Sequence, residues 1–247
     1  MGRRPSGRPV RPTTVGAVGE RTTLVVGGED GIGAAIAARL AARGDRVRTL
    51  PTEVDVTDAT AVAAVLRDGA PVDVVVLARI EPAAFVARAA VELDESAWDE
   101  ACERTIRASF VLLQQAHAVV RDEGRFVVVL PTVAATGVAG LVPLCTAVES
   151  VRVMAKAVAR RWGARGVTVN TIEVDLETFV RGDGSSEDAE DAGGIAVPSV
   201  PVLGQPSLPE RDAVGDVIGL IDLLAEPASG GLTGALLVVD RGTVLQP

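Results

Sequence analysis

The stretch Thr23-Leu-Val-Val-Gly-Gly-Glu-Asp-Gly-Ile-Gly33 decides the fold, together with the run 34–44 that follows it. Its apolar start predicts a buried strand, its glycines predict a tight turn, and the following run predicts a helix. That helix carries apolar residues at helical spacing, namely Ile32, Ile36 and Leu40. Gly44 stands where a glycine commonly follows a helix end. The whole stretch therefore predicts a strand–turn–helix unit.

Three glycines define the turn between this strand and this helix. Gly27, Gly31 and Gly33 allow the backbone to turn sharply, and they allow a ligand and the helix to approach the strand closely. The start of the helix then offers free N–H groups to an anion such as a pyrophosphate. Two interpretations remain open from these residues alone. Either the turn binds a pyrophosphate, or its glycines serve the packing of the strand against the helix.

The rest of the chain alternates strand-like and helix-like segments about six times. Apolar runs predict strands at 23–26, 46–50, 54–56, 72–77, 126–130, 167–172 and 235–239. Long helices are expected over about 94–121 and 143–162, and the capping-box spacing of Ser207-Leu-Pro-Glu210 predicts the start of a last helix. This alternation predicts a single-domain, Rossmann-like α/β fold: a doubly wound parallel sheet of about seven strands flanked by helices.

The domain is expected to span residues 21–247. Residues 1–20 are basic and lack a hydrophobic segment, which predicts a disordered arm rather than a signal peptide; a tether to an anionic partner is the alternative. Residues 181–206 are rich in Gly, Ser, Pro and acids, which predicts a mobile excursion.

Composition excludes several classes of function. The chain has 247 residues and a net charge of −9, which disfavours binding to nucleic acid or to an anionic membrane surface. Its two cysteines form no CxxC pair, which fits a reducing cytoplasm, and a single histidine rules out a metal site built from several histidines. No apolar run reaches the ~18 residues of a membrane span. The chain contains no tyrosine.

Over nearly its whole length the chain resembles the short-chain dehydrogenase/reductase family. The resemblance rests on five segments in the family's order: Gly27-x-x-x-Gly31-Ile32-Gly33, Asp55-Val-Thr-Asp58, Gly124-Arg-Phe-Val, Arg165-Gly-Val-Thr-Val-Asn170 and Thr233-Gly-Ala-Leu-Leu-Val-Val-Asp240. It implies hydride transfer between a nicotinamide, of NAD or NADP, and a carbonyl or alcohol. It also implies that the cofactor-binding residues are Gly27, Gly31, Ile32, Gly33 and Asp55.

The family's catalytic positions carry other residue types in this chain. In the family a tyrosine exchanges the proton, a lysine lowers the pKa of that tyrosine, a serine holds the oxygen, and an asparagine completes a proton relay. An ungapped count back from Arg165 places Leu144, Val148, Pro131 and Thr105 at these positions. Lys156, the only lysine, lies about two helical turns beyond the lysine position. Because acid–base catalysis contributes about 10²- to 10⁴-fold, this chain is expected to lack tyrosine-dependent hydride transfer.

The cofactor segments also depart from the family's pattern. Leu77-Ala-Arg-Ile80 replaces an Asn-Asn-Ala-Gly segment, and Val174-Asp175 replaces a Pro-Gly pair beside the nicotinamide. Leu50-Pro-Thr52 offers neither an acid for the ribose nor an arginine for a 2′-phosphate. Glu29 and Asp30 add negative charge within the turn, and one such charge at about 5 Å would repel a phosphate by at most about 3 kcal/mol at an effective dielectric constant of about 20, and by less where it is solvated.

Two other groups of side chains are alternative site candidates: Thr132, Cys145, Thr146 and Glu149 near the vacated positions, and Glu173 with Asp175 after a strand. Cys145 would be a nucleophile or Glu149 a base, although no histidine lies nearby in the sequence and Cys145 also suits packing. No metal site is expected.

The resemblance implies that the two long helices form a subunit bundle and that the last helix and strand form a second interface. Both long helices keep apolar residues suited to this: Ile106, Phe110, Leu113 and Val119, and Val148, Val151, Met154 and Val158. The leading hypothesis is a non-catalytic structural or regulatory subunit of a homo-oligomer, or of a hetero-oligomer with an active reductase. The alternatives are an atypical NAD(P)-dependent oxidoreductase of the ketoreductase type with displaced catalytic groups, and a cofactor-free catalyst or ligand sensor.

Overall fold

A computed structural model of the chain describes residues 21–27, 29–69, 71–182, 206–209 and 211–245. Residues 1–20 of the predicted arm and 183–205 of the predicted excursion lie outside these described residues. The described strands form one six-stranded parallel sheet in the order β2-β1-β3-β4-β5-β6. Their bounds are β1 Thr22–Val26, β2 Arg46–Thr49, β3 Val72–Leu77, β4 Val120–Pro131, β5 Thr168–Val174 and β6 Leu236–Val239. The predicted fold class is confirmed.

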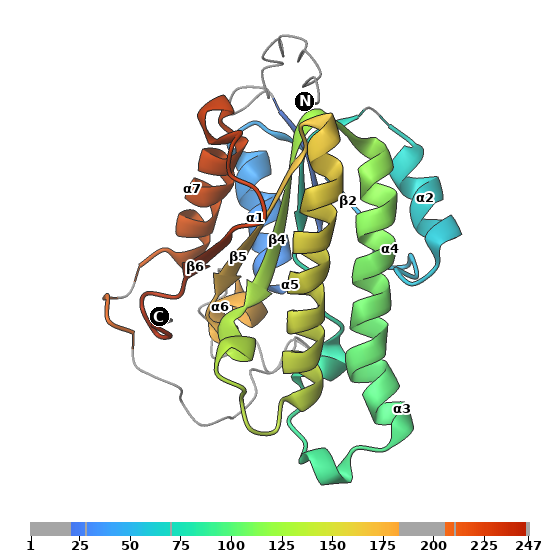
Figure 1. The fold of residues 1–247 in the computed structure, drawn as a ribbon, viewed down its shortest axis with the longest axis vertical. Coiled ribbons are helices and arrows are strands. Elements are labelled where there is room, and N and C mark those ends of the chain that lie inside the picture. The colour runs from blue at the N-terminus through green and yellow to red at the C-terminus, as the bar shows by residue number, and fades with distance from the viewer. Residues whose placement is uncertain (1–20, 28, 70, 183–205, 210, 246–247) are drawn as a thin grey trace, which may run out of the picture.

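Helices cover both faces of the sheet (Figure 1). One face carries α2 (Ala59–Arg67), α4 (Arg104–Val119) and α5 (Val142–Trp162), with α4 in contact with both α2 and α5. The other face carries α1 (Gly31–Ala42), α6 (Leu176–Arg181) and α7 (Ala213–Ala225), with α1 in contact with both α6 and α7. All strands are parallel, so their carboxyl ends meet at one edge, where ligands of such folds usually bind.

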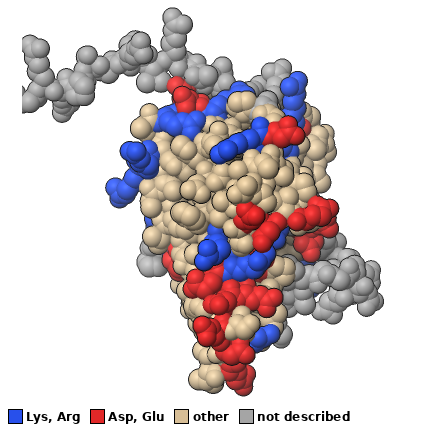
Figure 2. Space-filling view, turned by 90° about the vertical axis from the view of Figure 1, so that its right-hand side faces the viewer, with Lys and Arg blue, Asp and Glu red and all other residues tan. Residues whose placement is uncertain are grey.

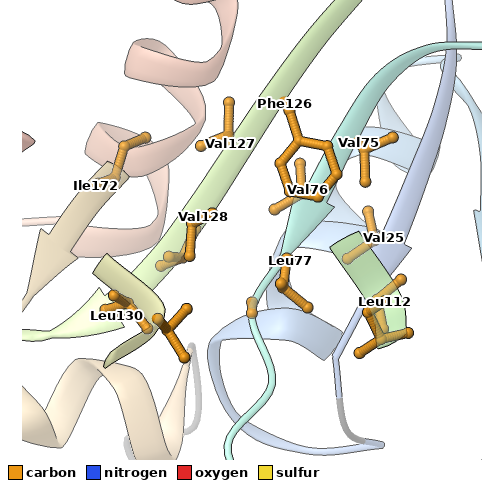
Figure 3. Close-up of a cluster of buried hydrophobic side chains, with 14 of the residues drawn as sticks. Val25, Val75, Val76, Leu77, Leu112, Phe126, Val127, Val128, Leu130 and Ile172 are labelled. Carbon is orange, nitrogen blue, oxygen red and sulfur yellow. The ribbon is translucent and has the colours of Figure 1, made fainter. Parts of the chain in front are cut away.

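The central strands form the core because they are apolar on both faces. Every residue of β3 and of β5 is buried, as is expected for parallel strands sandwiched between two helical layers. Figure 3 shows side chains from β1, β3, β4, β5 and α4 meeting in one cluster, with Phe126 and Leu77 near its centre. This packing makes the sheet a rigid platform for the loops at its carboxyl edge.

The helix predicted over 94–121 is confirmed in outline but has three parts. It comprises α3 (Glu95–Trp98), a π-helical segment (Asp99–Glu103) and α4, which ends at Val119 because β4 begins at the next residue. The carboxylate of Asp94 caps the start of α3 by accepting a hydrogen bond from the N–H of Ala97 at 2.8 Å.

Two local predictions were wrong. Residues 54–56 form no strand: the N–H of Val54 bonds to the carbonyl of Pro51, and a turn follows. Val56 is buried, so the apolar pattern at this point reflects a loop that contacts the core. The last helix begins at Ala213 rather than near Ser207, because the carboxylate of Asp212 accepts the N–H of Gly215 at 2.9 Å and caps it there.

A buried ion-pair network ties α1 and α7 to the amino end of β1. Arg21, which is 1% exposed, contacts Asp45 at 2.7 Å and Asp222 at 2.6 Å, and Arg43 also contacts Asp222 at 2.7 Å. The network lies at the opposite end of β1 from the glycine turn. Among the described residues, none of the helices combines the length and the apolar composition that a membrane crossing requires.

Candidate functional site

The glycine turn lies at the carboxyl edge of the sheet, and two of its glycines allow β1 and α1 to touch. A Cβ atom placed on Gly27 would lie 2.7 Å from the Cα of Gly33. Carbon atoms normally approach no closer than about 3.5 Å, so a side chain at Gly27 would force the helix away from the strand. Ile32, between Gly31 and Gly33, is buried in the core. Packing therefore accounts for Gly27, Ile32 and Gly33 without a ligand.

Gly31 faces a different neighbour, the carboxyl end of α6. Its φ of +65° is a conformation that favours glycine. A Cβ atom on Gly31 would lie 2.8 Å from the carbonyl oxygen of Val180 and 2.9 Å from that of Phe179. The backbone of α6 therefore fills the space directly beside Gly31.

The remaining space around the turn is a small cavity of about 60 Å³. Its lining comes from four segments: the turn and start of α1 (30–33), the segment after β3 (78–80), Pro82 with Phe85, and α6 through Phe179 and Val180. The rings of Phe85 and Phe179 lie 6.0 Å apart and close one side. Pockets that bind organic ligands measure about 300–1,000 Å³, so this cavity does not hold a dinucleotide in the described conformation.

The charges around the turn are unfavourable for an anion. Asp30 precedes α1 and makes no side-chain cap hydrogen bond, while the carboxylate of Glu29 accepts the hydroxyl of Thr52 at 2.9 Å. Acidic residues also gather at the lower end of the molecule, around α3 (Figure 2). The turn before α1 thus carries two carboxylates, neither of which caps the helix.

Asp55, the residue expected to contact adenine, already has protein partners. Its Oδ1 accepts the N–H and hydroxyl of Thr57 at 3.0 and 2.7 Å and a guanidinium N–H of Arg104 at 3.1 Å. These hydrogen bonds, those of Thr57 first, lower the pKa of Asp55. Arg104 also contacts Glu81, which pairs with Arg79 at 3.2 Å. Arg79, in the segment that replaces the family's Asn-Asn-Ala-Gly, is therefore part of a short chain of ion pairs.

The four residues at the family's catalytic positions make structural contacts, either by packing or by hydrogen bonds to the backbone. Leu144 and Val148 on α5 are 0% exposed. Pro131 ends β4, and the hydroxyl of Thr105 bonds to the carbonyl of Ala101 and the N–H of Glu81.

The candidates near these positions also have structural contacts. Thr132 is buried, the hydroxyl of Thr146 bonds to the carbonyl of Val142 at 2.8 Å, and the thiol of Cys145 lies 3.6 Å from the carbonyl of Val133. Burial raises the pKa of Cys145, which disfavours the thiolate that a nucleophile requires.

Glu173 and Asp175, at the end of β5, have different structural roles. The side chain of Glu173 is 0% exposed; its Oε1 lies 3.4 Å from Arg152, which also pairs with Glu149, and its Oε2 has no hydrogen-bond partner among the described residues. Burial is the main cause that raises the pKa of Glu173. Asp175 caps α6 by accepting the N–H and hydroxyl of Thr178 at 2.9 and 2.8 Å.

Two features of the site were not predicted. Helix α6 was missed, although Asp175 followed three residues later by Thr178 is a local cap signal. The link between Arg104 and Asp55 was missed because the two residues are 49 positions apart, and no local pattern marks such a pair.

Known proteins resemble this chain over most of its length. The profile of the family described as enoyl-(acyl carrier protein) reductase matches residues 46–244. A cyclic-di-GMP-binding biofilm dispersal mediator protein of Escherichia coli is 26% identical, with 92% of this chain and 98% of that protein covered. A D-threitol dehydrogenase of Mycolicibacterium smegmatis is 27% identical, with 92% and 94% covered.

A solved structure of a blue fluorescent protein from a metagenomic library, in complex with NADPH, has a TM-score of 0.67 and is 27% identical, with 91% of this chain and 98% of that chain covered. The profile match, the curated relatives and the sheet topology agree with one another. The chain belongs to the short-chain dehydrogenase/reductase family.

Proposed function

We propose that this chain is a family member without tyrosine-dependent hydride transfer that acts as a structural or regulatory subunit of an oligomer. The observation that carries the proposal is the burial of Leu144 and Val148 in a chain that has no tyrosine. Neither side chain can donate or accept a proton, and neither is accessible to a substrate. No displaced tyrosine can replace them.

The surroundings of these positions support the proposal. The only lysine, Lys156, is exposed on α5, about two turns beyond the lysine position. The hydroxyl of Thr105 is committed to the backbone. A proton relay from substrate to water would therefore lack its first donor and its connecting groups, which removes a contribution of about 10²- to 10⁴-fold.

The names of the relatives are compatible with more than one role in this family. One relative is named for binding cyclic-di-GMP rather than for a reaction, while another is named as a dehydrogenase. Family membership alone therefore does not decide between catalysis and a binding or scaffolding role, and the proposal rests on the residues of this chain.

The partner surface is proposed to be the outer face of α4 and α5, which lie side by side in Figure 1. An apolar groove of about 370 Å³ runs between them and is lined by Phe110, Leu113, Gln114, His117, Met154, Ala157, Val158 and Trp162. Phe110 is 56% exposed and Val153 is 60% exposed. Aromatic and aliphatic residues of this kind are typical of the centre of a protein interface.

We propose a second copy of this chain as the occupant of this face, because one patch that pairs with itself gives a closed two-fold dimer. Leu223 on α7 and Val238 on β6 are also exposed, and β6 is the edge strand, so these elements form the proposed second contact. An active homologue that presents the same face is the alternative partner.

Light scattering after gel filtration tests the assembly. The wild-type chain is expected to be an oligomer, and Phe110→Asp is expected to reduce its mass because a carboxylate would be buried in the groove. Val91→Asp is the matched control, since Val91 is 96% exposed and belongs to the segment Ala90–Glu92, which is part of none of α4, α5, α7 and β6. A wild-type chain that stays monomeric, both alone and mixed with an active reductase of the family, would contradict the proposal.

An atypical NAD(P)-dependent oxidoreductase remains the second candidate, and the name of the D-threitol dehydrogenase relative favours it. It would need a replacement proton donor, for which Thr132 and Glu173 were the candidates. Both are buried, and Glu173 pairs with Arg152. Steady-state oxidation of NADH or NADPH with a panel of ketones distinguishes the two functions: turnover at ordinary enzyme rates would favour this second candidate.

A further inference from the structure

We propose that α6 is a built-in occupant of the dinucleotide groove and that this helix keeps NAD and NADP out. The inference rests on the proposed function, because it concerns the same groove. It assigns the loss of cofactor binding to a single element of the chain rather than to the glycine turn, whose shape is retained.

Contact between backbones is the first observation. The carbonyl oxygens of Phe179 and Val180 lie within 2.9 Å of the position that a Cβ atom of Gly31 would take. At the end of α6, a Cβ atom on Gly182 would in turn lie 2.5 Å from the carbonyl oxygen of Gly31. Because neither glycine has room even for an added Cβ atom, the two backbones lie against each other and leave no layer between them for a phosphate group. Helix α6 therefore fills the space that a side chain at position 31 would occupy.

Charge is the second observation. The start of α1 presents N–H groups, which normally favour an anion. The group placed against this turn is instead the carboxyl end of a helix, whose carbonyl oxygens carry partial negative charge. Glu29 and Asp30 add two carboxylates beside the same turn. A phosphate would have to displace α6, and the two carboxylates would then repel it.

The contacts that hold α6 in place are separate from the turn itself. Asp175 caps its first turn through Thr178. Phe179 is 5% exposed and packs against the ring of Phe85, which follows β3. Changes at Asp175 or Phe179 therefore weaken the seating of α6 while all residues of the glycine turn stay as they are.

Calorimetric titration with NADH and with NADPH tests the inference. The wild-type chain is expected to bind neither at millimolar concentration. Phe179→Ala and Asp175→Ala are each expected to lower the dissociation constant at least about tenfold, because the binding-competent population rises as α6 is released. Val91→Ala is the control, since Val91 is 96% exposed and lines neither the cavity beside the turn nor the groove between α4 and α5, so this change is expected to leave dinucleotide binding unchanged.

Circular dichroism would first establish that each variant is folded. If Phe179→Ala does not fold, Asp175→Ala provides the test. Micromolar binding by the wild-type chain would overturn the inference, as would folded variants that bind no better than wild type. Variants that bind dinucleotide without reducing a ketone would support both the inference and the proposed function. Variants that bind and also reduce ketones at enzyme rates would support the inference and overturn the proposed function.

Discussion

Replacing Gly27 with alanine tests whether packing explains the glycine turn. The new Cβ atom would lie 2.7 Å from the Cα of Gly33 and 3.2 Å from its carbonyl carbon. Ordinary carbon contacts lie at about 3.5–4.0 Å, so β1 and α1 would have to separate by about 1 Å. Both contacting groups are backbone, so no side chain can rotate away to relieve the clash.

Overpacking of a core costs about 1–3 kcal/mol, and a contact between backbones belongs near the upper end of that range. We expect Gly27→Ala to lower the free energy of unfolding by about 3 kcal/mol. For a domain of this size, that corresponds to a melting temperature lower by roughly 6–12 °C. Urea denaturation, followed by circular dichroism in the absence of any dinucleotide, measures the difference.

Gly219→Ala provides the matched control. A Cβ atom on Gly219 would meet nothing within 4 Å, and this glycine lies inside α7. The same substitution is therefore expected to stabilise the chain, by about 0.5–1 kcal/mol. If Gly27→Ala unfolded at the same urea concentration as wild type, the packing explanation would be refuted, and a ligand would be needed to explain the glycine.

Three further predictions follow from buried charges and thiols. Asp45→Asn removes the charge of one of the two carboxylates that pair with the buried Arg21, while Asp222 remains, and should lower the free energy of unfolding by about 2 kcal/mol. Asp216→Asn breaks an exposed pair and should change it by less than about 1 kcal/mol; urea denaturation that found equal effects would contradict this. Glu173→Gln should gain stability relative to wild type as pH rises above about 4.5, because burial raises the pKa of Glu173, and the folded wild-type chain then retains a proton that the unfolded chain releases. Denaturation below and above that pH checks the sign, and a relative loss would refute it. Iodoacetamide should label neither cysteine rapidly near neutral pH, since burial raises the pKa of Cys145 and raises that of Cys102 to about 11. Fast alkylation of Cys145, detected by mass spectrometry, would restore it as a candidate nucleophile.

The features predicted correctly from the sequence are those with local causes. Buried parallel strands need continuous apolar runs, as in 72–77, and a helix end such as that at Gly44 needs a residue that tolerates positive φ. The segment 54–56 misled because buried residues of a loop and of a short strand have the same apolar pattern. Capping-box spacing near Ser207 misled because Asp212, closer to the apolar run, caps the helix instead.

The arrangement of the candidate site was less predictable because it depends on contacts between distant segments. Phe179 meets Phe85, and Arg104 meets Asp55, only after the sheet has formed. The sequence did indicate which family positions had changed, such as Leu144, but it did not indicate that α6 would lie against Gly31. A change of residue type is visible in the sequence at a single position. Whether a helix fills a groove is visible only in the folded structure, because it depends on segments that are distant in the sequence.

Transfer of deuteride from specifically deuterated NADPH and NADH to a panel of ketones tests the central claim most directly. Mass spectrometry of the alcohol product reports the chemical step itself, and an active reductase of the same family provides the positive control. The account predicts no deuterium in the alcohol above the level of a reaction without protein. Enzyme-dependent incorporation at the rate of the positive control would contradict it.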